Sequence, residues 1–381
     1  MTVAATALAR ATALGLPTTA LEDWRYVKCD AFAVPLDQPR RPSVEDLRAH
    51  VTAEHRAFVV VDGKFHSLGH GDWPAPWKPA FPSPAQDAAW AESLTSETDL
   101  AATWALAGEC RQVISVLGSH PEPLHVVNLA TGGASGWTLR IEVAAGAELD
   151  LVLHHIALGA ARSAPRLELV LGRSANVRVS EVQVTPWTHL LPTARLTLAA
   201  DAKATWVTAG TGGDLVRQRW EATLAGKGAD VSYQAATVVR GGHQIHHLTR
   251  VIHAAGHTTS SQDLRAVLHD QSRRSFDGVV SMPPGVDGSS AEQQDRNIVL
   301  SPGARADTRP QLDIRADEVK AAHGATIGRM DAEEVLYLRM RGLDLDQARG
   351  LLIGAFTAAV VDAMPDAFAK NLAQHLWNTT P

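Results

Sequence analysis

Cysteine is scarce in this chain of 381 residues, which contains only Cys29 and Cys110. Two cysteines cannot build a disulfide framework, and no Cys-x-x-Cys motif occurs that could hold a zinc ion or an iron–sulfur cluster within the chain alone. Both thiols are therefore expected to be small buried groups in a protein that works in a reducing compartment.

Positive charge is also in short supply. Lys and Arg total 35 against 41 Asp and Glu, which gives a formal net charge of −6, and no dense basic stripe is present. Because proteins that bind nucleic acids concentrate positive charge on one face, this balance argues against nucleic acid as a main partner.

Long apolar runs are missing. The longest one near the C-terminus, Leu351 to Val361, is too short to span a bilayer and contains Gly354. The first residues resemble a short amphipathic helix and lack the charged region and the long apolar run of a signal peptide. We therefore expect a cytoplasmic protein without a membrane partner.

Signature motifs of several enzyme classes are absent as well. The Gly-Lys pairs, Gly63-Lys64 and Gly226-Lys227, are not followed by Ser or Thr in a phosphate-binding frame. No Gly-x-Ser-x-Gly elbow marks a hydrolase. The chain is not expected to hydrolyse ATP itself.

What the chain does contain, from about residue 122, is alternation of apolar and polar residues, as in Leu139, Ile141 and Val143. A longer period is superimposed on it. A small or polar residue followed by Ala, and then by a strand, recurs at spacings of 28, 27 and 27 residues. The four pairs are Gly146-Ala147, Ser174-Ala175, Asp201-Ala202 and Gly228-Ala229. Gly256-His257 takes the same place 28 residues after the last of them, without the alanine. The motif returns at Gly303-Ala304 after a longer gap.

A fixed period of this size, built from paired short strands, is typical of a solenoid. We predict a mainly β fold with a parallel β-helix over about 122–316; a β-sandwich with regular turns is the alternative. The flanks are predicted to be an N-terminal mixed helical domain with a β-hairpin (1–121) and a C-terminal helical domain (317–381).

The N-terminal flank carries several local signals. Asp62-Gly63 between two apolar runs predicts a hairpin over Phe58–Phe65. Ser43 with Asp46 resembles an N-cap before a helix that ends at about His50. The remaining expectations are helices over 2–14 and about 86–106 and a loop over 72–84.

The C-terminal flank reads as three helices. Asp331 with Glu334, and Asp344 with Gln347, are capping-box patterns. The second helix has apolar residues at helical spacing, most of which we expect in the core: Ala348, Leu351, Leu352, Ala355, Phe356 and Ala359. A third helix is expected from Asp366 to Trp377. Such helices would cover the open ends of a β-helix.

Several histidines gather between residues 243 and 257. On a strand, His243 and His247 would share a face, as would His253 and His257, so a metal site is geometrically possible. No Asp or Glu is interleaved before Asp263, and imidazole ligands usually need such partners. We favour polar side chains on the outer face of the solenoid and keep as an alternative a metal-binding module made of His243, His246, His247 and His253.

Another histidine stands apart from this group. A strand-like run at Leu312 and Ile314 leads into a predicted turn that carries His323 and Gly324, before a helix begins at Asp331. A glycine keeps the backbone compact while the imidazole is presented. Taken alone, such a histidine is more often a structural hydrogen-bonding group than a ligand.

The segment around His323 resembles the C-terminal part of the SufD family, scaffold subunits of iron–sulfur cluster assembly. That family reads Pro-x-Leu-x-Ile, then Val-Lys-Cys-Ser-His-Gly-Ala-Thr-x-Gly, then Tyr-Leu-x-x-Arg-Gly. Ala321-Ala322 replaces the Cys-Ser of the family. The positions that match are Pro310, Leu312, Ile314, Val319, Lys320, His323, Gly324, Ala325, Thr326, Gly328, Tyr337, Leu338, Arg341 and Gly342. The runs Glu22-Asp23-Trp24-Arg25-Tyr26 and Phe276-Asp277-Gly278 are similar to further signatures of the family.

This resemblance implies a non-catalytic scaffold that pairs with the paralogue SufB through its β-helix end. His323 would lie at that interface as a candidate ligand of the nascent iron–sulfur cluster, with Gly324, Thr326 and Gly328 as supporting motif residues. Since Ala321 has no thiolate, other ligands would come from the partner. The C-terminal helices would dock SufC, an ABC-type ATPase that supplies the energy, with Tyr337, Arg341, Leu352 and Phe356 as candidate docking residues.

The resemblance leaves several points open. The cluster would be transient, so no cofactor is expected to stay bound to the isolated chain; flavin binding and homodimer formation are undecided. A SufB-like paralogue is the close rival, but Gly324 and the early Trp24-Arg25-Tyr26 favour SufD. A β-helix protein acting on carbohydrates is a more distant alternative, because no close carboxylate pair repeats on successive turns.

Overall fold

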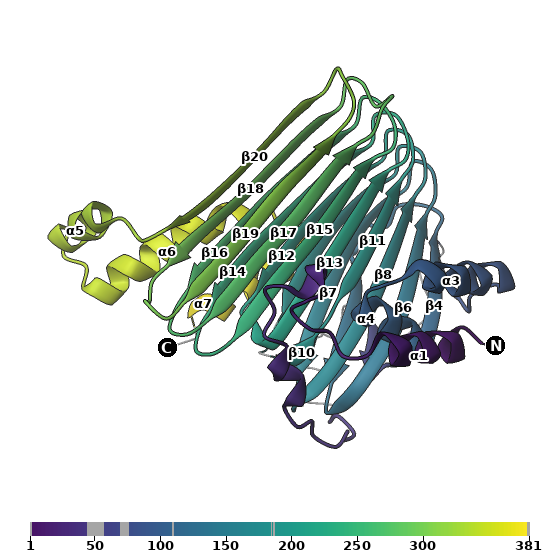
Figure 1. The fold of residues 1–381 in the computed structure, drawn as a ribbon, viewed down its shortest axis with the longest axis horizontal. Helices are drawn as coiled ribbons and strands as arrows, with labels where there is room; N and C mark the ends of the chain where they lie inside the picture. The colour runs from purple at the N-terminus through teal and green to yellow at the C-terminus, as the bar shows by residue number, and fades with distance from the viewer. Residues whose placement is uncertain are drawn as a thin grey trace.

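The computed structural model describes residues 2–43, 57–68, 76–108, 110–183, 185 and 187–378. Two sheets face each other, and the chain alternates between them so that each strand pairs in parallel with the strand before the preceding one (Figure 1). The predicted parallel β-solenoid is therefore confirmed.

The first sheet, sheet A, ends in a free strand at the C-terminal end of the solenoid. Its order is β2 (Lys64–Leu68), β1 (Ala57–Val61), β5 (Leu124–Ala130), β7 (Glu148–Ala157), β9 (Asn176–Gln183), β12 (Lys203–Gly210), β14 (Asp230–Val239), β16 (Thr259–Leu268), β18 (Ser290–Val299) and β20 (Lys320–Gly328). Only the β1–β2 hairpin is antiparallel, and its turn at Asp62 and Gly63 has φ of 47° and 80°, as the Asp-Gly signal predicts.

Sheet B lies opposite and is built in the same way. Its order is β19 (Arg305–Ile314), β17 (Arg273–Met282), β15 (Gln244–His253), β13 (Gly213–Leu224), β10 (Trp187–Leu190), β8 (Ala161–Leu171), β6 (Gly133–Val143), β4 (Cys110–Val116) and β3 (Trp77–Ala80). Strand β11 (Thr193–Leu198) continues beside β10 between β8 and β13. Trp77 thus lies in an edge strand, antiparallel to β4, where a loop was expected.

The repeated sequence motif marks the turn between the two sheets. Gly146, Ser174, Asp201 and Gly228 all have positive φ, between 55° and 77°, where small or short polar residues are favoured. The alanine that follows each of them is buried and donates its backbone N–H back across the turn, as Ala175 does to Gly172 at 3.1 Å. The period therefore exists because each turn of the solenoid needs one left-handed residue and one small buried one.

The inward faces of both sheets form one continuous apolar core. Alternate residues such as Ile141, Leu169, Leu196 and Trp220 are fully buried between the sheets. Burial of this kind contributes about 25 cal/mol for each Å² of apolar surface, so the stacked turns stabilise one another.

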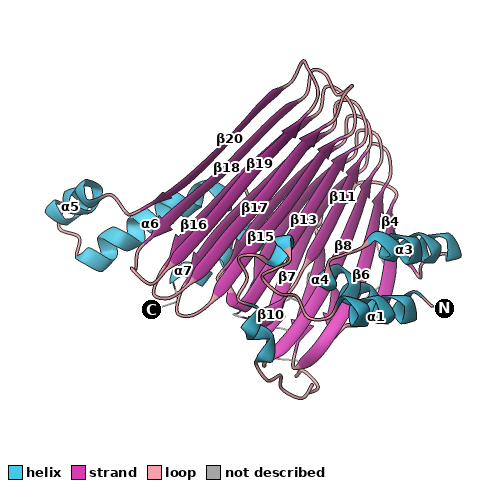
Figure 2. Cartoon of the chain, viewed as in Figure 1, coloured by secondary structure: helices cyan, strands magenta, loops and turns pink. Residues whose placement is uncertain are grey.

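The N-terminal helices cover the outer face of sheet B (Figure 2). They are α1 (Val3–Leu14), α3 (Pro84–Ser96) and α4 (Leu100–Ala107), with short 3-10 turns η1 (Glu22–Trp24) and η2 (Cys29–Ala33) between α1 and the solenoid. The stretch expected as one helix over 86–106 is two helices, because the backbone becomes extended at Glu97 and Asp99 then caps the second helix. The helix expected after Ser43 falls outside the described residues.

The C-terminal helices are α5 (Ala332–Met340), α6 (Leu345–Val361) and α7 (Ala367–Asn378). Helices α6 and α7 pack on the outer face of sheet A, whereas α5 projects from the end of the molecule (Figure 1). Asp344 and Gln347 form the predicted capping box, but Asp331 caps α5 only through the N–H of Glu333. Among the described residues, no helix is long and apolar enough to cross a membrane.

Candidate functional site

The C-terminal end of the solenoid is open. Strands β19 and β20 are the last strands of their sheets, and within the described residues neither has a neighbour on its outer side. Their side chains are only partly buried or exposed, and Ile314 and Ile327 are 38% and 51% exposed. Unpaired strand edges with exposed apolar side chains are ready to pair with another chain.

His323 lies in the middle of β20, not on a turn as predicted from Gly324. The backbone continues in parallel register with β18 from Lys320 to Gly328, so His323 stands beside Gln293 and Gly324 beside Gln294. Gly324 therefore lies in a regular strand and makes no turn; a Cβ at this position would approach the Oε1 atom at the end of the flexible Gln294 side chain to 2.6 Å, so that side chain would have to shift. The last strand also extends the solenoid past residue 316.

The His323 ring is exposed, and one of its nitrogens is held. Its Nδ1 atom lies 3.1 Å from the backbone oxygen of Pro310 on β19. A carbonyl oxygen only accepts hydrogen bonds, so in the neutral ring Nδ1 carries the proton and Nε2 has the lone pair. This tautomer leaves a competent metal ligand at the open end of the solenoid, because metal-bound imidazoles commonly donate their second nitrogen to a carbonyl.

The other residues of the predicted motif lie along the same strand. The backbone oxygen of Thr326 accepts a hydrogen bond at 3.2 Å from the side-chain amide of Asn297, and Gly328 ends the strand. Ala321 is partly buried against the core, two residues before His323. A side chain at this position therefore shares the face of His323, but an alanine adds no ligand atom.

The predicted docking residues lie on α5 and α6. Within the described residues α5 buries no side chain; its Tyr337 is 55% exposed, with Arg341 over the ring at 5.1 Å. Phe356 is half-buried, and Arg265 of β16 donates to its backbone oxygen at 2.8 Å, which ties α6 to sheet A. Leu352 is half-buried as well.

The buried face of α6 differs from the one predicted. It consists of Ala348, Ile353, Thr357, Val360 and Val361, whereas Leu351, Ala355 and Ala359 are exposed. The prediction was wrong for these three because the helix lies on a flat sheet through β-branched side chains, and helical spacing alone does not say which apolar stripe makes that contact. With Leu336 and Met340 of α5, Leu351 adds to the apolar surface at this end of the molecule.

Comparison with known proteins decides the family. The profile described as "SUF system FeS cluster assembly, SufBD core domain" matches residues 129–356, more than half of the chain. The chain belongs to the SufBD family. The iron–sulfur cluster assembly protein SufD of Escherichia coli is 25% identical over 371 residues, which cover 93% of this chain and 87% of that protein. This long match confirms the SufD assignment made from the sequence.

Two other relatives match over shorter stretches. The SufBD family protein slr0076 of Synechocystis is 42% identical over 109 residues, 29% of this chain and 24% of that protein. SufD of Bacillus subtilis is 29% identical over 204 residues, 52% of this chain and 46% of that protein. The SufBD core match begins in β5 and ends in α6, so it includes His323 and most of the solenoid.

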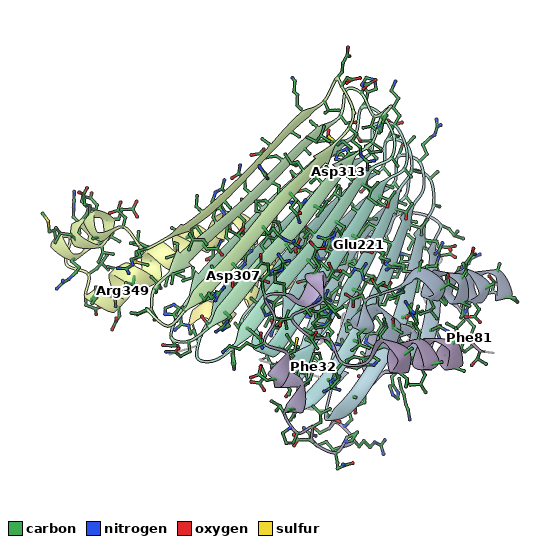
Figure 3. The ribbon with its side chains drawn as sticks, in the orientation of Figure 1. Phe32, Phe81, Glu221, Asp307, Asp313 and Arg349 are labelled. Atoms are coloured by element: carbon green, nitrogen blue, oxygen red, sulfur yellow. The ribbon has the colours of Figure 1, made fainter. Side chains whose placement is uncertain are left out.

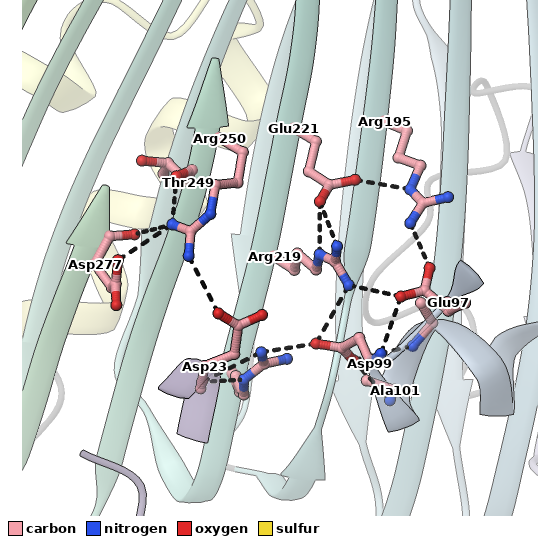
Figure 4. Close-up of polar contacts among 12 residues, drawn as sticks. Asp23, Glu97, Asp99, Ala101, Arg195, Arg219, Glu221, Thr249, Arg250 and Asp277 are labelled. Atoms are coloured by element: carbon pink, nitrogen blue, oxygen red, sulfur yellow. Dashed lines mark hydrogen bonds and ion pairs between the residues drawn. The ribbon is translucent and has the colours of Figure 1, made fainter. Parts of the chain in front are cut away.

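A second SufD signature, Glu22 to Tyr26, lies on the outer face of sheet B. Asp23 pairs with Arg250 at 3.1 Å, and Arg250 pairs with Asp277 at 3.1 Å (Figure 4). Arg309 of β19 pairs with both Asp277 and Glu22. The ion pairs cross from β15 to β19, the last strand of the sheet. The N-terminal signature therefore braces the strand against which His323 is held.

The same outer face carries a fully buried ion pair of this SufBD chain. Arg217 and Asp99 form an ion pair with 2.7 Å between guanidinium nitrogen and carboxylate oxygen, and both side chains are at most 1% exposed. Burial by itself raises the pKa of Asp99, but Arg217 and Arg219 outweigh it and hold this pKa below its ordinary value. Asp99 also caps α4 by accepting from the N–H groups of Ala101 and Ala102. Arg217 stacks on Trp24 at 4.1 Å, so one cluster anchors both α4 and the signature.

A buried polar group also lies inside the solenoid near its open end. Arg274 contacts Asp295 at 2.5 Å and Asn297 at 2.9 Å, and all three are almost fully buried. Sequence reasoning missed this group. The signal was present, because Arg274 and Asp295 occupy inward positions of the period-two alternation, where a charge must be paired.

The histidines between 243 and 257 do not form a metal centre within the described residues. The expectation of an outer-face position is wrong for His247 and His253, which share the inward face of β15 with Val251 and are buried. His246 shares the outer face with Gln244 and Arg250, as expected, but it is buried there beneath the N-terminal segment. His246 contacts Ser275 and Gln244, and His253 contacts Thr258 and Ser260, at 2.7–2.9 Å. Burial lowers the pKa of His246 to about 3 and that of His253 to about 4, so both are neutral structural groups.

Neither cysteine of this SufBD chain lies on β19 or β20, the strands that hold His323. Cys110 begins β4 near the N-terminal end of sheet B, and Cys29 lies in η2. Burial raises the pKa of the Cys29 thiol, and it raises the pKa of the Cys110 thiol to about 11. Neither is poised as a thiolate at neutral pH.

Proposed function

We propose that this chain is a non-catalytic scaffold subunit of iron–sulfur cluster assembly that contributes His323 to a nascent cluster shared with a partner. Membership in a family of cluster-assembly proteins supports the process. The single observation that carries the finer proposal is His323 itself, exposed on the last strand with Nδ1 engaged by Pro310 and Nε2 free.

The partner that suits the open end is a SufB-like paralogue. An exposed parallel edge is best covered by a second solenoid of the same construction, since its strands can continue both sheets. Ile314 and Ile327 would then become buried between the two chains. When the paralogue is missing, a second copy of this chain would be able to occupy the same edges and form a homodimer.

The nascent cluster is cargo of this site and not a resident cofactor. His323 offers one nitrogen, and Ala321 offers no sulfur, so the thiolates must come from the partner chain. Imidazole ligation of an iron–sulfur cluster has chemical precedent where histidines replace cysteines on one iron. A shared ligand set would allow the cluster to form only when both chains meet.

The exposed helices α5 and α6 are the proposed docking surface for a SufC-like ABC ATPase. Leu336, Tyr337, Met340 and Leu351 expose between 54% and 77% of their surface at the end of the molecule. Such an apolar group on a projecting element marks a protein contact. ATP hydrolysis would then belong to the partner, and this chain would transmit the movement of α5 and α6 to sheet A through Arg265 and Phe356.

The proposal is tested by His323→Ala in cells that depend on this chain. The variant should co-purify with its paralogue and ATPase in normal amounts, while the activity of iron–sulfur enzymes falls. His243→Ala, which removes a histidine from a turn outside the open end, is the matched control and should leave both readouts unchanged. Normal cluster-enzyme activity in the His323→Ala cells would remove this residue from the mechanism.

A further inference from the structure

A basic groove lies between the N-terminal segment and the outer face of sheet B. It has a volume of about 440 Å³ and is lined on one side by residues 17–19 and 25–30 and on the other by Arg273, Arg305 and Asp307. Asp307 marks its position on β19 (Figure 3). A volume of this size lies within the range of small-molecule sites.

The groove concentrates positive charge in a chain whose net charge is −6. Among the residues that line it, Arg25, Lys28, Arg273 and Arg305 outnumber Asp30 and Asp307, which leaves a lining with two net positive charges, although Glu22 beside the groove attracts Arg25. Arg305 is held by Asp307 at 2.7 Å. The side chains of the other three cations form no ion pair or hydrogen bond with any residue that the structure describes. Elsewhere on sheet B, arginines such as Arg195, Arg219 and Arg250 are paired.

The N-terminal segment that carries Arg25 and Lys28 is held rigidly against the solenoid. The side chain of Gln244 bonds both backbone atoms of Lys28, accepting from its N–H at 3.0 Å and donating to its oxygen at 3.3 Å. On either side of this point Trp24 and Phe32 are buried against the solenoid. The positive groups are therefore presented by an ordered backbone, which reduces the entropy lost when they bind a ligand.

The neutral groups in the groove suit an oxyanion. Thr18, Thr19 and Tyr26 supply hydroxyl groups beside the cations. Cys29 also lines the groove, but burial raises the pKa of its thiol, so it adds no negative charge at neutral pH. Arginine, lysine and hydroxyl donors together form the usual set that binds phosphate.

We propose that this groove binds a phosphate-bearing small molecule with at least two phosphate groups. A single phosphate would engage only part of a groove of this size, whereas a diphosphate offers oxygens to both walls, with Lys28 on the N-terminal segment and Arg273 on β17. The site is independent of His323 and of the proposed scaffold role. It lies on the strand and the N-terminal segment that brace the open end, so an occupied site would tie these two elements together.

The test is calorimetric titration of the full chain with inorganic pyrophosphate at 150 mM salt, with sulfate as the comparison anion. We expect saturable binding of one pyrophosphate, weaker binding of sulfate, and a loss of about tenfold or more in Arg273→Ala and in Lys28→Ala, as is typical when a charged hydrogen bond is removed. The matched controls are Arg173→Ala and Lys203→Ala, exposed residues without side-chain partners in the described structure, and both should bind as the unmodified chain does.

Two results would overturn the proposal. Equal weakening in the control variants would show that pyrophosphate responds only to net charge. Absence of saturable binding, together with reduced co-purification of a partner protein in Arg273→Ala, would assign the groove to acidic side chains of that partner. Because Arg273 has no described side-chain contact, its variant should fold, and an unchanged melting temperature checks this.

Discussion

The buried Arg217–Asp99 pair offers the sharpest quantitative prediction, through Asp99→Asn. The substitution keeps an oxygen that can cap α4 but removes the negative charge 2.7 Å from Arg217. Arg217 would then be left almost fully buried beside Trp24, with the backbone oxygen of Asp23 at 3.4 Å as its remaining acceptor. A buried charge that loses its partner costs about 3–5 kcal/mol.

The size of this loss matters because whole domains are stable by only about 5–15 kcal/mol. Asp99→Ala should cost about 1 kcal/mol more, since it also removes the helix cap. The control is Arg178→Ala, which breaks an equally short pair with Asp150 that is partly exposed, and exposed pairs contribute about 0–1 kcal/mol.

The assay is urea unfolding of the isolated chain, followed by tryptophan fluorescence, together with hydrogen exchange of residues 22–33. Asp99→Asn should lower the free energy of unfolding and speed exchange of this segment, because Arg217 anchors Trp24. The double variant Asp99→Asn with Arg217→Met should recover part of the loss, since no unpaired charge remains. If Asp99→Asn cost no more than Arg178→Ala, the buried pair would not anchor the N-terminal segment.

Three further predictions concern acid stability and the two proposed contacts. His246 and His253 have folded-state pKa values of about 3 and about 4, below the unfolded value of about 6.5, so the unfolded chain binds more protons between these limits. The free energy of unfolding should therefore be highest above about pH 6.5 and decrease as the pH drops toward 4. His253→Gln should make this decrease smaller, and a pH profile identical to that of the unmodified chain would contradict the assignment. Ile327→Lys on β20 should reduce co-purification of the paralogue at least about tenfold without changing the melting temperature, because a charge would be buried in the new interface, whereas Ile252→Lys on the outer face of β15 should have no effect. Met340→Glu on α5 should release the ATPase while the paralogue stays bound, with the exposed Leu8→Glu at the opposite end as control; retention of the ATPase would place its docking surface elsewhere.

The solenoid could be predicted because its repeat is local. Ser174 and Asp201 indicate turns with a left-handed backbone, and the alanines after them indicate that successive turns of the solenoid stack closely. The period is therefore visible in the sequence without knowledge of any long-range contact. The inward charges were harder to place. Arg274 and Asp295 look like surface residues until the packing of β17 in sheet B over β18 in sheet A brings them together.

The position of His323 shows what local reasoning cannot supply. Gly324 suggested a turn, but the residue continues a strand beside Gln294 of the neighbouring strand, a pairing between residues 30 positions apart. Likewise, the pattern of α6 shows two apolar stripes, and only the docked helix shows that Ile353 and Val360 face the sheet. The family motif identified the correct histidine, while its geometry came from the tertiary pairing of β20 with β18.

The central claim is that His323 acts at a shared cluster and does not merely hold the fold. The most direct measurement is the iron and sulfide content of the purified complex with its paralogue after anaerobic reconstitution, compared between the unmodified chain and His323→Ala. We predict that the variant complex assembles and melts as the unmodified one does but retains substantially less cluster. Equal cluster content in the two complexes would contradict the account.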